Sequence, residues 1–460
     1  MQPISIVDSE GFKKMLHAFD KHYALPSRHY FSRVVLPNIR TSEPYISLTV
    51  HFIDAEFNLK VKCLQTAFMP EDHTGQNIAH GLREALAEWG LNEGQLVCIT
   101  TDNAANIKLA AEINGWLRLQ CFGHRLHLAI ENAMKDPRIS RAMGVCKRLR
   151  ALEEVQKQLN LPEHSLKTEF PTRWGSREAM IDRVLEQQKA IAQVLSNDRK
   201  LRHLILSWQD IDVLEAVNKS LSPLVEFTDA LSGEKYVSVS LVKPTLHLFN
   251  NSILEDKEDD TQLSKTIKHD ILEYLNEKYS DQVTQELLDM ASALDPRFKL
   301  KYADEDIKES IVERLKVEMR DVKTASAMER APLETAAQAA GTEDADPCKK
   351  RKKGLGSFFK VTTDKAAGYP PQEDQVIALE IQSYLQVETL DPEKDPLTWW
   401  RDAKAIYPRL SKLARKYLCI PATSSSSERV FSTSGHIVSC LRSSLKPDHV
   451  NRLVFLAKNL

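Results

Sequence analysis

The chain has 460 residues, of which 42% are hydrophobic and 27% charged, and its formal net charge is -2. This composition predicts a folded chain of several domains and excludes a polycation, so contact with nucleic acid must come from local patches. No apolar run has the roughly 20 residues that a bilayer span needs, and the first residues lack a signal-peptide core. Seven cysteines without CxxC pairs favour a reducing, intracellular compartment.

The N-terminal third of the chain has the element pattern of an α/β fold. Residues 1–44 are expected to form a helical lead, and residues 45–69 predict a β-hairpin of two runs rich in β-branched and aromatic residues. An amphipathic helix follows and stops at Gly90. A strand over residues 96–101, a helix from about Asn103, a short strand and a further helix complete the alternation.

The rest of the chain is helical on both sides of one polar segment. Residues 181–325 show helical periodicity almost throughout and predict an all-α block. Residues 326–372 are rich in polar residues and alanine and predict a disordered, solvated linker, and helical patterning returns over 373–460. The linker holds a basic run that favours a nuclear import signal over a plain solvated stretch: Lys349, Lys350, Arg351, Lys352 and Lys353.

Asp102 ends the predicted strand, in the sequence QLVCITTDNAANI. The carboxyl end of a strand is where α/β sheets place functional groups. The alternative is an N-cap or turn aspartate that serves the helix starting near Asn103, and position alone favours this alternative.

Two further motifs carry residue types that suit a site. Cys121, His124 and His127 lie three apart, which is metal-like spacing, but three ligands without a fourth favour a packed cysteine and a structural or site-lining histidine over zinc. Arg173 and Trp174 precede a helix. They fit a hydrophobic staple about as well as a phosphate contact with a base-stacking ring.

The C-terminal sequence DPLTWWRDAKAIYPRLSKLARKYLCIPATSSSSERVFSTSG closely resembles the dimerisation segment of hAT-family transposases. Shorter stretches occur in the family's order, among them LQTAFMPEDHTGQNIA, CITTDNAANI, CFGHRLHLA, TRWGS and LDPRFK. Nearly the whole chain therefore resembles the BED zinc-finger group of proteins domesticated from these transposases.

The resemblance implies an RNase H-like mixed sheet over residues 45–180, an all-α insertion over 181–325 and a helical C-terminal dimerisation region over 373–460 that completes the core. Such enzymes transfer phosphoryl groups with two Mg²⁺ or Mn²⁺ ions about 4 Å apart, held by three carboxylates. Carried over by motif, Asp102 and Glu428 match two of these carboxylates. The same comparison places four residues beside bound nucleic acid: Cys121, His124, Arg173 and Trp174.

Two departures from the family pattern bear on activity. A BED finger normally opens these proteins, and no such Cys/His set is found in this sequence, which leaves sequence-directed DNA binding unsupported. The first strand, which carries the remaining catalytic aspartate, has no match, because no acid lies between Asp20 and Glu43 and Asp54 is at the wrong end of the hairpin. Residues 32–39 could fill that place only in part, since Pro37 interrupts a central strand.

Dimerisation is then the expected activity, because residues 380–460 carry the most intact motif. Interface cores favour aromatic residues. The candidate anchors, whose alternative role is the core within one chain, are Trp399, Trp400, Tyr407, Leu410, Leu413, Leu418 and Phe431.

The sequence thus predicts a nuclear, domesticated and catalytically degenerate hAT transposase relative that forms a homodimer or higher oligomer. It is expected to bind DNA weakly, if at all, in a regulatory role, and to have no membrane contact. No cofactor is expected unless residual nuclease activity requires Mg²⁺ or Mn²⁺ at the incomplete Asp102 and Glu428 site. The alternatives are an active two-metal transposase or nuclease, and a truncated or misassembled gene product without function.

Overall fold

The computed structural model describes residues 45–146, 167, 169, 174–197, 202–233, 235–328, 373–437 and 447–459. The predicted helical lead, Arg173 and the predicted import signal at 349–353 lie outside these residues.

The first described element is the hairpin that the sequence predicts. Strand β1 (Tyr45–Ile53) pairs antiparallel with β2 (Leu59–Phe68), with one irregularity in register after Leu48. The turn is held by Asp54, whose carboxylate accepts hydrogen bonds from the backbone N–H groups of Glu56 and Asn58 at 3.0 and 2.8 Å. A carboxylate that accepts local N–H groups stabilises a tight turn, so the hairpin is fixed by its own sequence.

A second pair of strands is short and parallel. Strand β3 (Ile99–Thr101) pairs with β4 (Arg118–Gln120), and helix α5 (Ala105–Asn114) connects them. The predicted strand over residues 96–101 is thus confirmed only in its last three residues. Helix α5 ends at Gly115, whose φ of 68° is the left-handed conformation that glycine adopts without strain.

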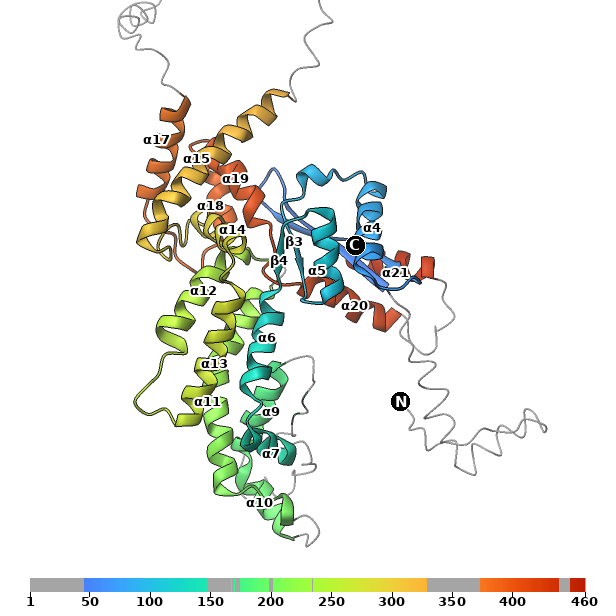
Figure 1. Ribbon diagram of the computed structural model, residues 1–460, viewed down its shortest axis with the longest axis vertical. Coiled ribbons are helices and arrows are strands. Elements are labelled where there is room, and N and C mark those ends of the chain that lie inside the picture. Colours follow the sequence, from blue (N-terminus) through green and yellow to red (C-terminus); the bar gives the residue numbers. More distant parts are fainter. Residues whose placement is uncertain are drawn as a thin grey trace, which may run out of the picture.

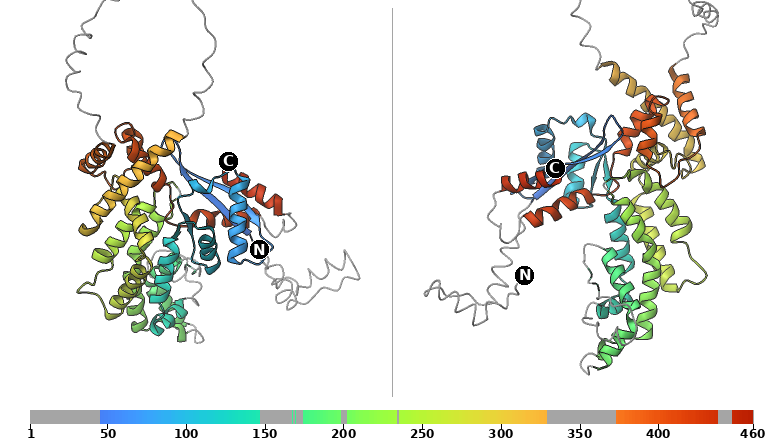
Figure 2. Two further views of the ribbon diagram at one scale, coloured as in Figure 1. Left: turned by 45° about the horizontal axis from the view of Figure 1, so that its top comes forward. Right: turned by 180° about the vertical axis from the view of Figure 1, so that it is seen from behind.

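Helices cover both faces of the strands (Figures 1 and 2). Helix α4 (Gly75–Glu88) and α5 pack on one face, where their apolar residues meet Ile46 and Leu48 of β1. Helices α20 (Ser425–Ile437) and α21 (Pro447–Asn459) pack on the other face through a small cluster: Cys63, Val430, Val450 and Val454. Alternate residues of β1 therefore face the helices on opposite sides of the sheet, as the two-residue period of a strand requires.

The expected single mixed sheet is not observed in the described part of the chain. The strands form two separate two-stranded sheets, β1–β2 and β3–β4, without hydrogen bonds between them. The molecule as described is mostly helical with a small two-sheet region.

The remaining helices form an elongated body beside the sheets, with α6 and α13 packed along each other (Figure 1). They are α6 (Phe122–Ala133), α7 (Pro137–Cys146), α9 (Trp174–Glu186), α10 (Gln188–Asn197), α11 (Trp208–Leu231), α12 (Val242–Leu248), α13 (Gln262–Lys278), α14 (Gln282–Ala293), α15 (Glu305–Met328), α17 (Glu373–Gln386), α18 (Pro396–Ala403) and α19 (Pro408–Leu418). Short helical turns lie at Glu93–Gln95, Arg202–Leu204, Val239–Leu241 and Phe249–Ile253. None of the described helices combines the length and the apolar character that a bilayer crossing requires.

Candidate functional site

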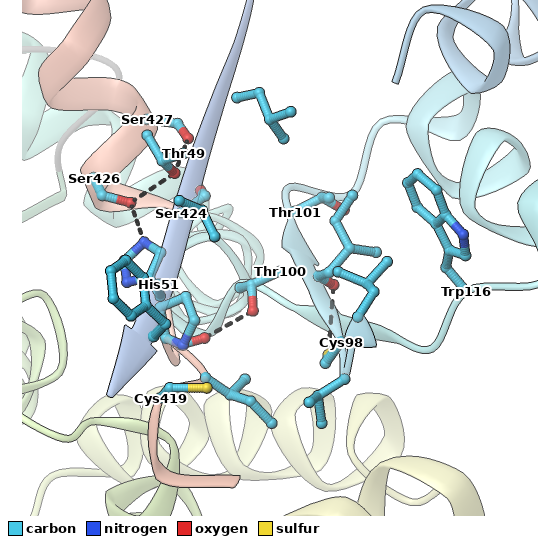
Figure 3. Close-up of a pocket in the computed structure, with 18 of the residues that line it drawn as sticks. Thr49, His51, Cys98, Thr100, Thr101, Trp116, Cys419, Ser424, Ser426 and Ser427 are labelled. Carbon is cyan, nitrogen blue, oxygen red and sulfur yellow. Dashed lines mark hydrogen bonds between the residues drawn. The ribbon is translucent and has the colours of Figure 1, made fainter. Parts of the chain in front are cut away.

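A large cavity lies between the two sheets, and both carboxylates singled out by the sequence line it. Its volume is about 1530 Å³, and Asp102, His124 and Glu428 are among the residues that line it. Figure 3 shows β1 on one side of this space and β3 on the other, with serines of α20 beside β1. Sequence positions 102 and 428, far apart in the chain, therefore line one cavity in the folded structure.

Asp102 follows β3 directly and is exposed. Its carboxylate accepts a hydrogen bond from the backbone N–H of Ala104 at 3.1 Å, and Arg118 of β4 donates to its carbonyl oxygen at 3.0 Å. The N-cap of α5 is Ala104, without a side-chain capping bond. Asp102 thus holds a turn between β3 and α5 and is not the N-cap, and its carboxylate still has capacity to accept further hydrogen bonds.

Glu428 lies in the first turn of α20 and is also exposed. Its backbone N–H donates to the Ser424 carbonyl at 3.2 Å, and the Ser424 hydroxyl donates to its carboxylate at 3.4 Å. An acidic residue at this place interacts favourably with the positive end of the helix dipole. Among the described residues, the hydrogen bonds of Glu428 are thus with Ser424 of its own segment, and they hold it at the cavity.

Helix α20 is attached to β1 by hydroxyl and imidazole groups (Figure 3). The Thr49 hydroxyl lies 3.4 Å from that of Ser426 and 3.2 Å from that of Ser427, and His51 Nε2 lies 3.1 Å from the Ser426 hydroxyl. Sequence reasoning missed this cluster. The one available signal was the polar residues at alternate positions of β1, Ser47, Thr49 and His51. No local pattern, however, connects β1 with serines that lie nearly 380 residues later in the chain.

The CFGH motif connects β4 and α6 to the segment before α20. Cys121 is buried, and its Sγ accepts a hydrogen bond from the Ser424 backbone N–H at 3.3 Å. Phe122 N–H donates to the Ala422 carbonyl at 2.9 Å, and Thr100 Oγ1 donates to the Pro421 carbonyl at 2.8 Å. Cys121 therefore fixes the start of α20, whereas His124 lines the cavity itself.

His127 lies one turn after His124, with ring centroids 6.3 Å apart. Burial lowers the pKa of His127, which favours its neutral form. Across the residues that the structure describes, no group of three or more His, Cys, Asp or Glu side chains is arranged to hold a metal ion. The two carboxylates do not by themselves fit a two-metal centre.

Trp174 begins α9 and packs into the main hydrophobic core, with 4% of its surface exposed. Its Nε1 has no hydrogen-bond partner in the described part of the chain. A role in stacking on a base would require this ring to be uncovered, and its neighbour Arg173 lies outside the described residues.

The candidate dimerisation residues divide into two groups. Five of them are buried within this one chain, where they pack α17, α18 and α19 against α14 and α15: Trp400, Tyr407, Leu410, Leu413 and Leu418. Trp399 is partly buried against the same core, whereas Phe431 of α20 is 42% exposed. In the described monomer, Phe431 is thus the member of this set best placed to meet a partner.

Comparison with known proteins finds two matching families. Residues 38–158 match the ZBED1 RNase-like domain, and residues 380–460 match the hAT family C-terminal dimerisation region.

Similar proteins occur in animals and plants. Zinc finger BED domain-containing protein 4 of Homo sapiens is 26% identical over an alignment that covers 100% of this chain and 42% of the relative. Zinc finger BED domain-containing protein RICESLEEPER 2 of Oryza sativa subsp. japonica is 24% identical over 89% of this chain and 62% of its own. The putative AC transposase of Zea mays is 22% identical over 90% of this chain and 54% of its own.

The chain spans 42% to 62% of the length of these three relatives. The two matched regions enclose the helical block at residues 181–325, and they contain Asp102 and Glu428 respectively. The chain therefore carries a ZBED1-type RNase-like domain and a hAT C-terminal dimerisation region, and its relatives are BED zinc-finger and hAT transposase-derived proteins.

Proposed function

We propose that this chain is a domesticated, catalytically degenerate hAT transposase relative that acts in the nucleus as a dimer. The observation that supports the loss of catalysis is the cavity between the sheets. Asp102 and Glu428 both line it, but among the described residues no group of three or more His, Cys, Asp or Glu side chains could hold a metal. The sequence ahead of β1 also has no acid between Asp20 and Glu43.

We propose an RNase H-like core made of residues 45–180 and 373–460, with residues 181–325 inserted and 326–372 as a linker. Two observations support this division. The described strands come from the N-terminal part of the chain, whereas the helices that cover them come from both ends, and α20 is joined to β1 by the Thr49 and His51 contacts. A core assembled from both ends keeps its former metal-site residues together even when the chemistry is lost.

Self-association is the activity for which the comparisons give most support, since the dimerisation region is matched over residues 380–460. Phe431 on α20 and Leu456 on α21 are exposed apolar residues on two helices that contact each other. Exposed apolar side chains on adjoining helices are typical of a protein-binding surface. We propose this α20–α21 surface as the dimer contact.

The test is light scattering of the full chain after size exclusion. The wild type is expected at twice 52.2 kDa, and the double variant Phe431→Glu/Leu456→Glu at 52.2 kDa. Trp208→Glu is the matched control, because Trp208 is 70% exposed and lies outside the dimerisation region. A wild type that runs as a monomer at micromolar concentration would remove the proposal. Truncation before Glu373 is not a clean alternative, since it would delete Trp400 from the core.

The proposal also includes weak binding of DNA. Arg173, Trp174, His124 and Cys121 are the residues proposed to lie near bound DNA, and among those described His124 lines the cavity while Cys121 and Trp174 are buried. Binding by phosphate contacts alone is salt-dependent and insensitive to sequence. Fluorescence anisotropy with two unrelated duplexes should give similar, weak affinities. Both affinities should fall steeply between about 50 and 200 mM salt, as they do for proteins that bind through phosphate contacts.

An active nuclease is the second candidate, because Asp102 and Glu428 do line one cavity. It predicts strand cleavage or transfer with Mn²⁺ that is abolished by Asp102→Ala. The degenerate protein is expected to show no Mn²⁺-dependent product above that of the variant. Any product that depends on both Asp102 and Mn²⁺ would replace our proposal with the enzyme.

A further inference from the structure

Arg118 and Arg125 place two guanidinium groups at the carboxyl ends of β3 and β4. Arg118 begins β4, and its Nη1 reaches along the strand pair to donate to Thr101 Oγ1 at 3.1 Å and to the Asp102 carbonyl at 3.0 Å. Arg125 lies near the start of α6, where its Nε donates to the Gln120 side chain at the end of β4. Both arginines are partly buried. In α/β sheets, the carboxyl ends of parallel strands are where ligands bind.

Neither guanidinium group has an ion-pair partner among the residues that the structure describes. Their acceptors are two hydroxyl groups, one backbone carbonyl and one side-chain amide, all of them neutral. Burial, followed by the positive charge of Arg125, lowers the pKa of Arg118. The carboxylates of Asp102 and Glu112 act in the opposite direction, although neither forms an ion pair with Arg118. Charges withdrawn from water are normally paired, so two like charges held together here favour a bound anion.

Each of the two groups keeps N–H donors for such an anion. A guanidinium carries five N–H donors. Both hydrogen bonds of Arg118 come from Nη1, so its Nε and Nη2 have no acceptor among the described residues. Arg125 uses Nε and Nη1, which leaves its Nη2 without an acceptor in the same part of the chain. Paired N–H groups of this kind form the fork with which arginine binds two oxygens of one anion.

A polar network from α13 holds the end of β4 and, with it, Arg125. Gln120 Nε2 donates to the Lys278 carbonyl at 3.2 Å, and the Tyr279 hydroxyl donates to the Gln120 carbonyl at 3.3 Å. The Tyr274 hydroxyl accepts a hydrogen bond from Arg125 Nη1 at 3.1 Å. A side chain whose rotamer is already set by its neighbours loses little freedom when a ligand binds. The network thus positions Arg125 through neutral groups and leaves its charge uncompensated.

We propose that Arg118 and Arg125 form a binding site for one phosphate group, either free or in a DNA backbone. The planar fork of arginine matches two phosphate oxygens, and two arginines can share the oxygens and the negative charge of one phosphate. Neither arginine is among the residues that the family resemblance placed beside nucleic acid. The site does not depend on the proposed DNA binding, because free phosphate presents the same oxygens.

Thermal unfolding of the full chain at fixed ionic strength, with and without inorganic phosphate, tests the site. A ligand that binds only the folded state stabilises it, so millimolar phosphate should raise the unfolding midpoint of the wild type, and the effect should saturate. In Arg118→Gln and in Arg125→Gln the apparent dissociation constant for phosphate should rise by about tenfold or more. Arg138→Gln is the matched control, because it removes the same charge from a residue that already pairs with Asp136.

Phosphate also stabilises proteins without binding, through its exclusion from their surfaces, and that effect should be equal in all variants. What tests the site is the difference between Arg138→Gln and the two site variants. A purely structural role predicts that the site variants unfold at lower temperature without phosphate and keep the full response to it. That pattern, or equal responses in all four proteins, would overturn the site. Arg125→Lys keeps the charge without the fork, and its affinity for phosphate should lie between those of the wild type and Arg125→Gln.

Fluorescence anisotropy with a DNA duplex distinguishes the two sources of phosphate. Each phosphate contact contributes about 0.9 to the slope of log affinity against log salt concentration. For a backbone phosphate, Arg118→Gln/Arg125→Gln should lower that slope by about one, and Arg138→Gln should leave it unchanged. A wild type that responds to phosphate but binds no DNA would assign the site to free phosphate and remove only the proposed DNA binding. A double variant that matches Arg138→Gln in both measurements would remove the phosphate site.

Discussion

The two halves of the C-terminal dimerisation region use their apolar residues differently. Helices α17, α18 and α19 join the helical body through a dense aromatic cluster, in which the ring centroids of Trp399 and Trp400 are 4.9 Å apart and those of Tyr384 and Trp400 are 5.3 Å apart. Helices α20 and α21 instead cover the β1–β2 sheet through a cluster of four small residues. One half is therefore mainly structural, whereas the other leaves Phe431 exposed and borders the cavity.

The same contrast applies to charged groups. In the helical body, Asp260 has a fully buried side chain that pairs with Lys268 at 2.5 Å and with Lys219 at 3.1 Å. At the cavity, Asp102 and Glu428 are exposed and their described contacts are local hydrogen bonds. Buried ionic groups are costly to disturb, whereas exposed carboxylates are free for a site.

The largest loss of stability is expected from Trp400→Ala. Trp400 is fully buried, and its Nε1 donates to the Leu294 carbonyl at 2.8 Å. Removing a buried aromatic ring costs about 3–5 kcal/mol. Urea unfolding followed by circular dichroism measures the change. Ile406→Ala, at an exposed site of the same region, should change stability by less than about 0.5 kcal/mol. Similar losses of stability in both variants would contradict the assignment of Trp400 to the core of the single chain.

A loss of about 3 kcal/mol is expected from Asp260→Asn, because Lys268 then keeps a buried charge without its partner. Burial opposes ionisation of Asp260, but its bonds with Lys268, the Lys257 backbone and Lys219 outweigh that cost, so its pKa lies well below the ordinary 3.8. The unfolded chain therefore binds this proton first, and the stability from Asp260 is present above about pH 4 and lost as pH falls below it.

Urea midpoints of the wild type and Asp260→Asn at pH 7, 4 and 3 test this sign. The difference between the two proteins should shrink as the pH falls. Asp259→Asn is the matched control, since the Asp259 side chain is exposed although it also contacts Lys219. A difference that stays constant with pH would show that Asp260 acts by packing alone.

A smaller loss of about 1–3 kcal/mol is expected from Val454→Ala. Val454 is fully buried between α21 and β2, but its cluster is small and can relax around the missing methyl groups. Leu456→Ala on the exposed side of α21 should leave unfolding of the monomer unchanged. The sharper readout is hydrogen exchange in β2, which should quicken in Val454→Ala and not in Leu456→Ala.

The smallest effect is expected from Asp102→Asn and Glu428→Gln. Both side chains are exposed, so each variant should shift stability by less than about 0.5 kcal/mol. A change above about 1 kcal/mol in the free energy of unfolding would mean that the two carboxylates stabilise the turn after β3 and the start of α20. Their main role would then be structural.

The hairpin, the order of strands and helices and the position of Asp102 at a strand end could all be predicted from the sequence. Each depends on local signals: alternation in β1, turn chemistry at Asp54 and helical spacing in the insertion. The roles within the dimerisation region could not be predicted in the same way. The same aromatic and leucine pattern serves an interface or a core, and only packing against α14 and α15 places Trp400 and Leu410 inside.

What the sequence determined by itself was the identity of the elements and the absence of an acid between Asp20 and Glu43. The tertiary structure alone decided that Asp102 and Glu428 share one cavity, because contacts between residues so far apart depend on how the layers pack. It also decided that β1 and β3 face each other across an open space. Strand pairing is a property of neighbouring edges in space, and the pattern of a single strand does not specify which strands lie beside it.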